Sequence, residues 1–323
     1  MSNRTKIWLI AAVILTLAGC ILLGGAMSMI NWDFSKLSTS KYITNTHEIP
    51  EPFSHISVTS DTADIRFVPS ENEKCTVVCC EQENVIHNVA VADGTLVIRV
   101  NDTRKWYEHI GFHFGTPNIT VYLPASEYGT LSVRSDTGDV EIPRDFHFHS
   151  IDVSESTGDV ANYASTADGI KIKTSTGRIS VESVSAKFLD LSASTGDITV
   201  SNAVCEGGVT VNVSTGKTLL TAVSCNSVRS DGSTGSISLS SVIAADTITI
   251  KRSTGRITFE KSDASEIFVK TDTGDVKGTL LSDKVFITKT DTGRIRVPDS
   301  VKGGRCEITT DTGDIHIEVV DGN

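Results

Sequence analysis

The stretch 151–200 holds three copies of one pattern: IDVSESTGDVAN at 151–162, IKIKTSTGRISV at 170–181 and LDLSASTGDITV at 189–200. Each copy has a Thr-Gly pair flanked by apolar residues at every second position. Such alternation predicts two strands, each with one buried face, joined by a turn at the glycine. Along the whole chain the pair recurs ten times, with Gly at 138, 158, 177, 196, 216, 235, 255, 274, 293 and 313. The spacing of 19 or 20 residues is typical of a repeat architecture.

The apolar positions keep a fixed register relative to the glycine. Seven residues before it, all ten copies have an apolar residue, and the positions five before, two after and four after are apolar with few exceptions. The exceptions at these three positions are Ser230, Thr288, Thr218, Asn162 and Gly278. A unit this short cannot fold alone, so it must stack on its neighbours. Residues 131–320 are therefore predicted to form an all-β, parallel β-helix-like β-solenoid of ten rungs, 19–20 residues each and about 48 Å long.

The turn has its own chemistry. Glycine can adopt a positive φ, and the Ser or Asp two residues earlier is expected to bond the turn backbone. The residue after the glycine alternates in charge from Asp159 to Lys217 and again from Arg256 to Asp314. Alternation avoids like charges on neighbouring strands, so it predicts a structural charge ladder, whereas a catalytic or metal-binding row would concentrate carboxylates.

The start of the chain predicts a membrane anchor. Residues from Ile7 to Ile30 form a run of 24 without a charged side chain, enough for about 36 Å of helix. Arg4 and Lys6 precede it, which favours a cytoplasmic N-terminus and an extracytoplasmic C-terminal part. The alternative is a lipoprotein signal, since Leu17-Ala18-Gly19-Cys20 resembles a lipobox. The apolar run continues past Cys20, which favours an uncleaved helix, and both readings tether the domain to a membrane.

The regions around the solenoid carry weaker signals. A degenerate copy of the repeat spans Asp61 to Ile65, and strands are predicted at 75–80, 85–91, 95–100 and 118–123, with a loop at 104–115. These segments are interpreted as an insertion capping the N-terminal end of the solenoid. At the other end, Ile315 to Val320 is expected to be the last rung, and either it leaves an open strand edge or Asp321 and the chain end act as its cap. The predicted boundaries are 1–6 cytoplasmic tail, 7–30 transmembrane helix, 31–50 tether, 51–130 N-terminal β region with the degenerate rung and capping insertion, and 131–320 solenoid.

Composition narrows the function classes. The net charge of −11 disfavours nucleic acid and anionic lipid, which both need a positive surface. The seven cysteines contain no CxxC pair, so zinc-ribbon and thioredoxin readings fail. Disulfides and buried thiols both remain open for the six cysteines outside the anchor.

Several motifs resemble catalytic or metal-binding sites, but either the repeat accounts for the motif or the other residues that such a site needs are missing. Asp-Thr-Gly at 136–138, 272–274, 291–293 and 311–313 resembles an aspartic-protease motif, yet six copies carry Ser in place of Asp. Calcium binding near Asp311 and Asp314 lacks the Gly-Gly-x-Gly-x-Asp nonapeptide of Ca²⁺ β-rolls. The pairs His109/His113 and His147/His149 lack a third zinc ligand, and no Ser-His-Asp arrangement is expected.

A family resemblance rests on the anchor, the F-x-x-I-x-V start (Phe53, Ile56, Val58), the strand ITVYLP at 119–124 and the serial S/D-T-G-D/R turns. Together these resemble the bacterial putative-adhesin family, which includes LiaG-type membrane proteins of Gram-positive envelope-stress operons. The resemblance covers 50–320 and implies a cell-surface solenoid of unassigned activity, with no catalytic residues to carry over. The chain departs from wall-anchored adhesins because it lacks a C-terminal LPxTG signal with a hydrophobic tail.

The sequence thus predicts a single-pass cell-membrane repeat protein whose extracytoplasmic solenoid is a non-catalytic module for binding, adhesion or envelope-stress sensing. No catalytic, cofactor-binding or metal-binding residue and no cofactor is predicted. The expected partners are the membrane, an envelope protein or a cell-wall glycan, and not nucleic acid. One alternative is a carbohydrate-active enzyme on a β-helix, although Asp190, Asp246 and Asp263 do not repeat in register. The other is a self-assembling surface scaffold joined through the open edge of the last rung.

Overall fold

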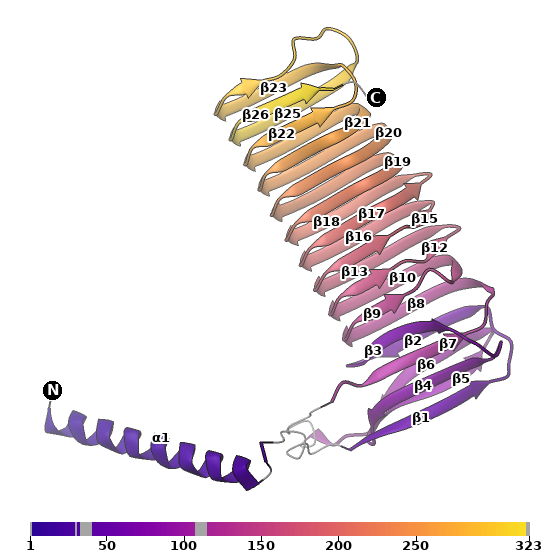
Figure 1. The fold of residues 1–323 in the computed structure, drawn as a ribbon, viewed down its shortest axis with the longest axis vertical. Coiled ribbons are helices and arrows are strands. Elements are labelled where there is room, and N and C mark those ends of the chain that lie inside the picture. The colour runs from indigo at the N-terminus through magenta and orange to yellow at the C-terminus, as the bar shows by residue number, and fades with distance from the viewer. Residues whose placement is uncertain (1, 30, 33–40, 107–114, 321–323) are drawn as a thin grey trace.

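The computed structural model describes residues 2–29, 31–32, 41–106 and 115–320. One helix, α1 (Asn3–Met29), precedes an all-β region (Figure 1). Over Arg4–Met29 this helix is long and apolar enough to cross a membrane, and its large apolar side chains are exposed. It begins four residues before the predicted span because Ser2 caps it: the Thr5 N–H donates to the Ser2 hydroxyl at 3.3 Å.

The β region is one continuous sheet system of 26 strands. Its N-terminal part consists of β1 (Tyr42–Ile49), β2 (His55–Ser60), β3 (Asp64–Pro69), β4 (Cys75–Gln82), β5 (Val85–Ala92), β6 (Thr95–Asp102) and β7 (Asn118–Leu123). The first rungs with a Thr-Gly turn follow as β8 (Glu127–Thr137), β9 (Val140–Ile142), β10 (His147–Thr157), β11 (Val160–Asn162), β12 (Ser165–Thr166), β13 (Gly169–Thr176), β14 (Ile179–Glu182), β15 (Ser185–Ala186), β16 (Phe188–Thr195), β17 (Ile198–Cys205) and β18 (Gly208–Thr215). The remaining rungs are β19 (Thr218–Thr234), β20 (Ile237–Thr254), β21 (Ile257–Thr273), β22 (Val276–Leu280), β23 (Lys284–Thr292), β24 (Ile295–Arg296), β25 (Gly304–Thr312) and β26 (Ile315–Val319).

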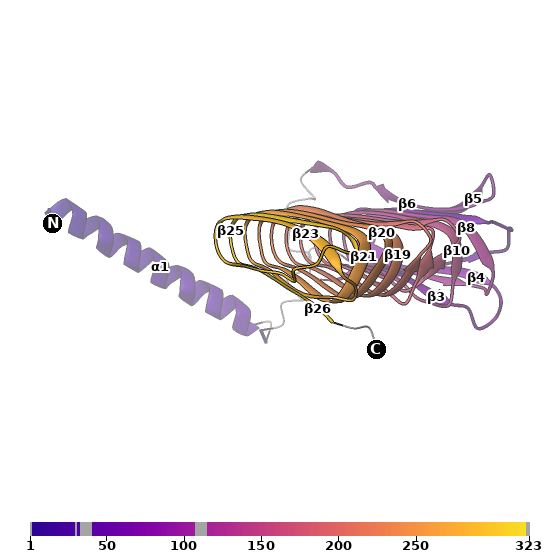
Figure 2. The ribbon, with the colours of Figure 1, turned by 90° about the horizontal axis from the view of Figure 1, so that it is seen from above.

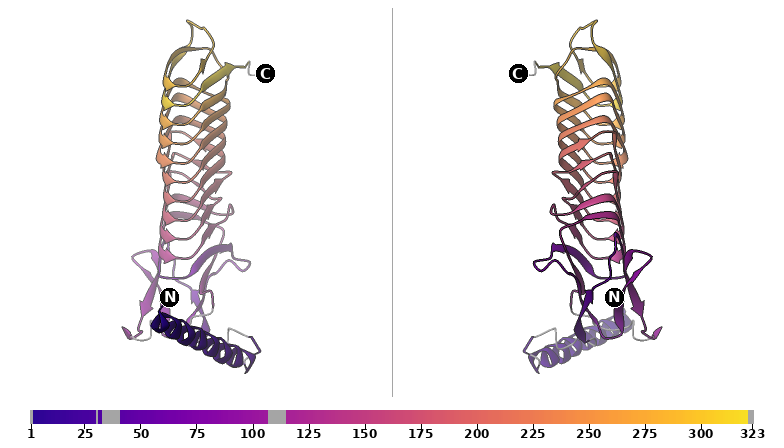
Figure 3. Two further views of the ribbon diagram at one scale, coloured as in Figure 1. Left: turned by 90° about the vertical axis from the view of Figure 1, so that its left-hand side faces the viewer. Right: turned by 90° about the vertical axis from the view of Figure 1, so that its right-hand side faces the viewer.

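The predicted β-solenoid is confirmed. The strand before each glycine pairs in parallel with its counterpart in the next rung, so that Ile151 lies opposite Ile170 and Val153 opposite Ile172. The strand after each glycine pairs in the same way on the opposite side of the rod, as in β9, β11 and β14. Seen from above, the rungs superpose as a flattened oval, and from the sides they form one column (Figures 2 and 3). The apolar residues of both strands meet inside this oval as one core.

The turn glycines are required by how closely the rungs stack. Gly196 has φ +145°, and a Cβ built on it would lie 1.8 Å from the carbonyl oxygen of Gly177 in the preceding rung. The Gly177 N–H in turn donates to the Thr195 carbonyl at 2.9 Å. The same close approach recurs down the column, so any side chain would push two rungs apart.

The Asp after the glycine accepts a hydrogen bond from the turn backbone of the next rung. The sequence pattern predicts this role for a different residue, the Ser or Asp two positions before the glycine. Asp159 Oδ1 accepts the Arg178 N–H at 2.7 Å, and Asp197 Oδ1 accepts the Lys217 N–H at 2.7 Å. Arg178 also contacts the other oxygen of Asp159 through its guanidinium at 2.7 Å. Partial burial would raise the pKa of Asp159, but the backbone N–H and guanidinium of Arg178 hold that pKa below its ordinary value.

A second corner recurs six residues after the glycine. Ser183, Asn202, Ala222, Ser241 and Lys261 all have φ between 46° and 57°. This left-handed residue turns the chain from the second strand into the connector, which is itself extended in β19, β20 and β21. This corner cannot be recognised from the sequence, because five successive copies form it without a glycine.

Five strands form what we call the N-terminal cap: β1, β4, β5, β6 and β7. β6 pairs in parallel with β2 of the degenerate rung, and β7 pairs in parallel with β3. On their other edges, β6 pairs antiparallel with β5, and β7 pairs antiparallel with β4. β1 pairs antiparallel with β4 over its whole length, from Tyr42 opposite Gln82 to Ile49 opposite Cys75. The predicted tether at 31–50 is therefore wrong for residues 42–49, which the alternate inward side chains of β1 fix to the cap. Most of the predicted loop at 104–115 lies outside the described residues.

The order of the last two rungs differs from the chain order. β25 and β26 pair on one side with β21 and β22 and on the other with β23 and β24. The open edge therefore lies at β23 and β24, and the prediction of an edge at 315–320 is wrong. Burial explains this order. Ile315 and Ile317 are 0% and 2% exposed between two rungs. The 284–298 rung contains Thr288 and Pro298, so it would pack less well between two neighbours.

The same reordering breaks the predicted charge ladder at this end. In space the residues after the glycines run Arg256, Asp275, Asp314 and Arg294, so two carboxylates are neighbours. Lys277 donates to Asp275 and holds its pKa below the ordinary value. The backbone N–H and the guanidinium of Arg294 do the same for the pKa of Asp314. Like charges are thus tolerated where each has its own cation.

Candidate functional site

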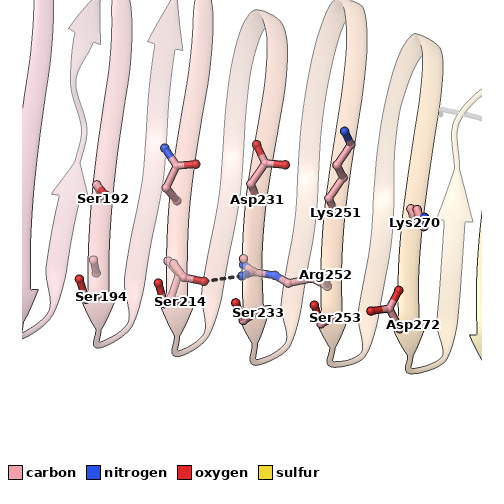
Figure 4. Close-up of a pocket in the computed structure, with 14 residues that line it drawn as sticks. Ser192, Ser194, Ser214, Asp231, Ser233, Lys251, Arg252, Ser253, Lys270 and Asp272 are labelled. Carbon is pink, nitrogen blue, oxygen red and sulfur yellow. Dashed lines mark hydrogen bonds between the residues drawn. The ribbon is translucent and has the colours of Figure 1, made fainter.

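A shallow groove of about 490 Å³ runs along the outer face of the solenoid beside the glycine turns (Figure 4). It crosses five rungs, from β16 to β21, which at about 4.8 Å per rung is roughly 19 Å long. Two rows of outward side chains line it. One row, two residues before each glycine, consists of Ser194, Ser214, Ser233, Ser253 and Asp272. The other, four residues before, consists of Ser192, Asn212, Asp231, Lys251 and Lys270.

Arg252 lies beneath this groove and is 3% exposed. Its Nη1 donates to the Val213 carbonyl at 2.9 Å, and its Nη2 donates to the Thr218 hydroxyl at 2.9 Å. A Cβ on Gly232 would lie 1.5 Å from Nη1, so the guanidinium occupies the space that a side chain there would take. Burial lowers the pKa of Arg252, while nearby Asp231 acts in the opposite direction.

Arg252 explains one exception in the apolar pattern. Thr218 replaces Val or Ile because its hydroxyl accepts from the guanidinium. Ser230, a second exception, is 1% exposed between Val211 and Ile250, and nothing in the structure explains it. The groove therefore has a charged group hydrogen-bonded beneath it. The Thr218 exception is visible in the sequence, but its link to Arg252, 34 residues away, is not.

A second polar cluster lies inside the N-terminal cap. Glu81 on β4 and His87 on β5 are 1% and 5% exposed. Glu81 Oε2 lies 2.7 Å from His87 Nδ1 and accepts the His87 backbone N–H at 2.7 Å, while Oε1 accepts from Asn45 on β1 at 2.7 Å. His87 Nε2 lies 3.3 Å from the hydroxyl of Ser60 on β2.

This cluster corrects the expectation that no Ser-His-acid line forms. Ser60, His87 and Glu81 are joined in one hydrogen-bonded line, with Ser60 only 3% exposed. A buried hydroxyl cannot meet a large substrate, so the line joins strands: β1 and β4 on one side of the cap with β2 and β5 on the other. Removing one partner from such a buried network leaves the others unsatisfied, which typically costs about 1–3 kcal/mol.

Cys79 completes the cluster. It precedes Glu81 by two residues on β4, shares the inward face and is 0% exposed. Burial, and then the charge of Glu81, raises the pKa of the Cys79 thiol to about 12. The alternation over 75–82 would have placed Cys79 and Glu81 on one face. The sequence does not show that β4 pairs with β5 across residues 83–84. This pairing places His87 beside the other two side chains.

The histidines and aspartates of the sequence motifs lie at the surface wherever the structure describes them. His147 and His149 are exposed on either side of the buried Phe148 on β10, and His109 and His113 lie outside the described residues. The Asp of each Asp-Thr-Gly lies on the exposed side of its turn, as Asp272 does in Figure 4. All seven cysteines, each within the described residues, are free thiols in the structure.

Three solved structures are similar to this chain, and the first of them supports the fold. A putative lipid binding protein from Parabacteroides distasonis ATCC 8503 matches with a TM-score of 0.50 and 15% identity, covering 85% of this chain and 97% of that one. A putative adhesin from the same organism matches with a TM-score of 0.48 and 12% identity, covering 87% and 98%. A putative adhesin from Bacteroides fragilis NCTC 9343 matches with a TM-score of 0.44 and 15% identity, covering 86% and 97%. No curated protein matches the chain.

A family model gives the assignment. Residues 53–217 match the family described as Toastrack DUF4097, from the start of β2 through the fifth Thr-Gly turn. The match spans just over half of the chain and includes the F-x-x-I-x-V start and the serial turns, so the resemblance drawn from the sequence is confirmed. This chain belongs to the Toastrack DUF4097 family.

Proposed function

We propose that this protein is a membrane-anchored, non-catalytic binding module that holds its solenoid outside the membrane and binds an extended polar ligand along the groove. The helix α1 supports the anchor, and Arg4 and Lys6 at its start favour a cytoplasmic N-terminus. The rigid column of rungs supports a binding role because it presents the same positions at a constant interval. Adhesion and envelope sensing are two uses of such a surface.

The groove carries this proposal. Its first row has a hydroxyl on four of the five rungs and a carboxylate on the fifth, and its second row adds a hydroxyl, an amide, a carboxylate and two ammonium groups. A linear polymer lying along the axis would meet equivalent donors and acceptors about every 4.8 Å. Polysaccharides offer hydroxyl and amide groups in such a series, so a cell-wall glycan is the ligand class that fits best. The groove is polar, which favours a glycan over the acyl chains of a lipid, the ligand class named for one of the matched structures.

The groove contains two carboxylates, so a second candidate function, that of a carbohydrate-active enzyme, is also considered. Asp231 and Asp272 lie two rungs apart, and the Asp231 carboxylate is held by Arg229 at 2.7 Å. A glycosidase needs one carboxyl as acid and another as base or nucleophile across the same bond. The Asp231 carboxylate is engaged by Arg229 within its own rung, which opposes a role at a glycosidic bond.

The test uses the full chain in detergent micelles, sedimented with purified cell-wall sacculi. The variant Lys251→Glu/Lys270→Glu reverses two groove charges, and Lys187→Glu/Lys302→Glu is the matched control, with an equal change of charge at exposed positions outside the groove. We expect binding to weaken about tenfold or more in the double variant and to be unchanged in the control.

Three outcomes decide the matter. Equal loss in both variants would reduce the effect to net charge and contradict a groove site. Release of reducing ends from sacculi would contradict the non-catalytic assignment and favour the enzyme. Absence of sedimentation with sacculi, together with crosslinking of the groove to a protein on intact cells, would replace the glycan with an envelope protein.

A further inference from the structure

The buried cluster of the N-terminal cap brings together three metal-ligating side chains. The Sγ of Cys79, a carboxylate oxygen of Glu81 and a ring nitrogen of His87 all lie within 4.8 Å of one another. All three side chains are buried, at 0%, 1% and 5% exposure. Each comes from a regular strand, so the backbone fixes its direction: Cys79 and Glu81 alternate onto the inner face of β4, and His87 faces them from β5.

We propose that Cys79, Glu81 and His87 form a binding site for one divalent transition-metal ion of the Zn²⁺ class. Sulfur, nitrogen and oxygen donors in one site suit an ion of intermediate softness and disfavour Ca²⁺ and Mg²⁺, which prefer oxygen alone. Three protein ligands leave one tetrahedral position, which a water would complete.

The separations fit this assignment with small movements. Ligands held about 2.0–2.3 Å from a tetrahedral ion lie roughly 3.3–3.8 Å from one another. Glu81 Oε2 and His87 Nδ1 are 2.7 Å apart, so they must move apart by about 1 Å, and the sulfur must move by a similar amount at most. A side-chain rotation is enough, because the strands that position the three residues need not shift.

Groups around the cluster already hold the ligands in the way that metal sites require. The Asn45 amide and the His87 backbone N–H both donate to Glu81, and neither bond is lost when the ring moves away. The Ser60 hydroxyl contacts the second ring nitrogen of His87 and fixes the ring plane. Such outer partners orient ligands, and losing one typically weakens metal binding about 10–100-fold.

The bound ion would act as a clamp. It would join β4 of one sheet to β5 of the other at the end of the solenoid that needs closing, while leaving the groove untouched. The inference is independent of the proposed glycan ligand. A purely hydrogen-bonded network is the competing account, and it predicts no stoichiometric ion.

The first test loads the purified full chain in micelles with Zn²⁺ or Co²⁺ and then dialyses it. We expect one ion per chain and, with Co²⁺, the near-ultraviolet absorption of a thiolate-to-metal charge transfer. Cys79→Ser and His87→Gln should lose the ion and the absorption, and Asn45→Ala should bind about 10–100-fold more weakly. Cys75→Ser is the matched control, because Cys75 is a buried thiol on the same face of β4 outside the cluster.

Wild type retaining no more ion than Cys79→Ser would overturn the proposal, as would a cobalt–thiolate absorption that survives in Cys79→Ser. A second measurement needs no variant and so does not depend on variant folding. In the wild-type chain, added Zn²⁺ should slow alkylation of Cys79 at least tenfold and leave alkylation of Cys306 and Cys225, which lie in the solenoid core, unchanged. Equal slowing at all three thiols, or none at Cys79, would also overturn it.

Discussion

The two ends of the solenoid are built differently. At the N-terminal end, the strands of the cap continue both sheets, turn antiparallel and enclose a hydrogen-bonded cluster of which Glu81 and His87 are the core. At the C-terminal end the sheets stop at β23 and β24, where Ile295, at an inward position of the repeat, remains 42% exposed. The difference teaches that stacking extends a solenoid without ending it. Closing an end takes sequence that departs from the repeat.

The open end also shows how the chain limits the cost of exposure. The final rung in sequence is placed inside, and the rung with fewer inward apolar residues is placed outside. Its edge carries Lys289, Asp291 and Arg294, charged side chains that discourage pairing with a second chain. At the N-terminal end the cap strands cover the core instead, so that Val77, Cys79 and Leu96 are each 0% exposed.

The largest expected effect comes from a turn glycine in the middle of the column. Gly196→Ala should destabilise the protein by about 3 kcal/mol or more, since its Cβ would overlap the Gly177 carbonyl oxygen at 1.8 Å. Gly293→Ala has a similar overlap, 2.0 Å from the Gly313 oxygen, but lies on the outermost rung, which can move away. We expect it to cost about 1–2 kcal/mol. Urea unfolding of the full chain in micelles measures both.

Gly208→Ala is the control for the glycine pair. Its Cβ would meet only the Ser227 hydroxyl at 3.0 Å, which can rotate, and no positive φ is involved. It should change stability by well under 1 kcal/mol. Equal losses for Gly196→Ala and Gly208→Ala would mean that the stacked carbonyls do not dictate the turn.

A matched pair of isoleucines at one repeat position sharpens the comparison between interior and end. Ile315→Ala should cost about 3 kcal/mol, because Ile315 is 0% exposed between two rungs. Ile295→Ala should cost about 1 kcal/mol, because Ile295 is 42% exposed on the outermost rung. A larger loss of stability for Ile295→Ala than for Ile315→Ala would indicate that the rungs stack in chain order, and it would contradict the structure at this end. Thermal and urea unfolding of the two variants decide between them.

The smallest effect concerns a buried carboxyl near the N-terminal end. Glu155 is 3% exposed, and burial, with Asp136 adding to it, raises its pKa from 4.5 to about 7. The folded state therefore binds the proton more tightly than the unfolded state. The resulting stability is complete below pH 4.5 and is lost as the pH rises to about 7.

Glu155→Gln should remove this dependence and be the more stable protein above pH 7. Melting temperatures of both proteins across this range give the comparison, and the difference between them isolates Glu155 from the other carboxyls. A wild type whose stability rises relative to the variant between pH 4.5 and 7 would contradict the assignment.

The repeat determined what could be predicted. The rungs, their parallel pairing, the inward positions and the helix at the start follow from patterns of period two, from the glycine spacing and from the uncharged run. Residues 75–80, 85–91, 95–100 and 118–123 were each assigned as strands, and each overlaps an observed strand. Local alternation was enough for these segments because each strand has one buried face.

Long-range features could not be predicted, for physical reasons. Every rung presents the same pattern to its neighbours, so the sequence cannot say that β25 lies between β21 and β23. The antiparallel partner of β1 has no local signal, and Arg252 reaches carbonyl and hydroxyl groups 39 and 34 residues away. The cap cluster likewise draws Asn45, Ser60, Glu81 and His87 from four strands. Such sets become visible only once the pairing is known.

Amide hydrogen exchange on the full chain in micelles tests the difference between the two ends most directly. The account predicts strong protection for β25 and β26, protection of β4 and β7 comparable to that of the central rungs, and fast exchange along β23 and β24. Fast exchange in 315–319 together with protection in 284–296 would show that the rungs follow chain order and would contradict the account. Fast exchange throughout β4 and β7 would contradict a closed N-terminal end.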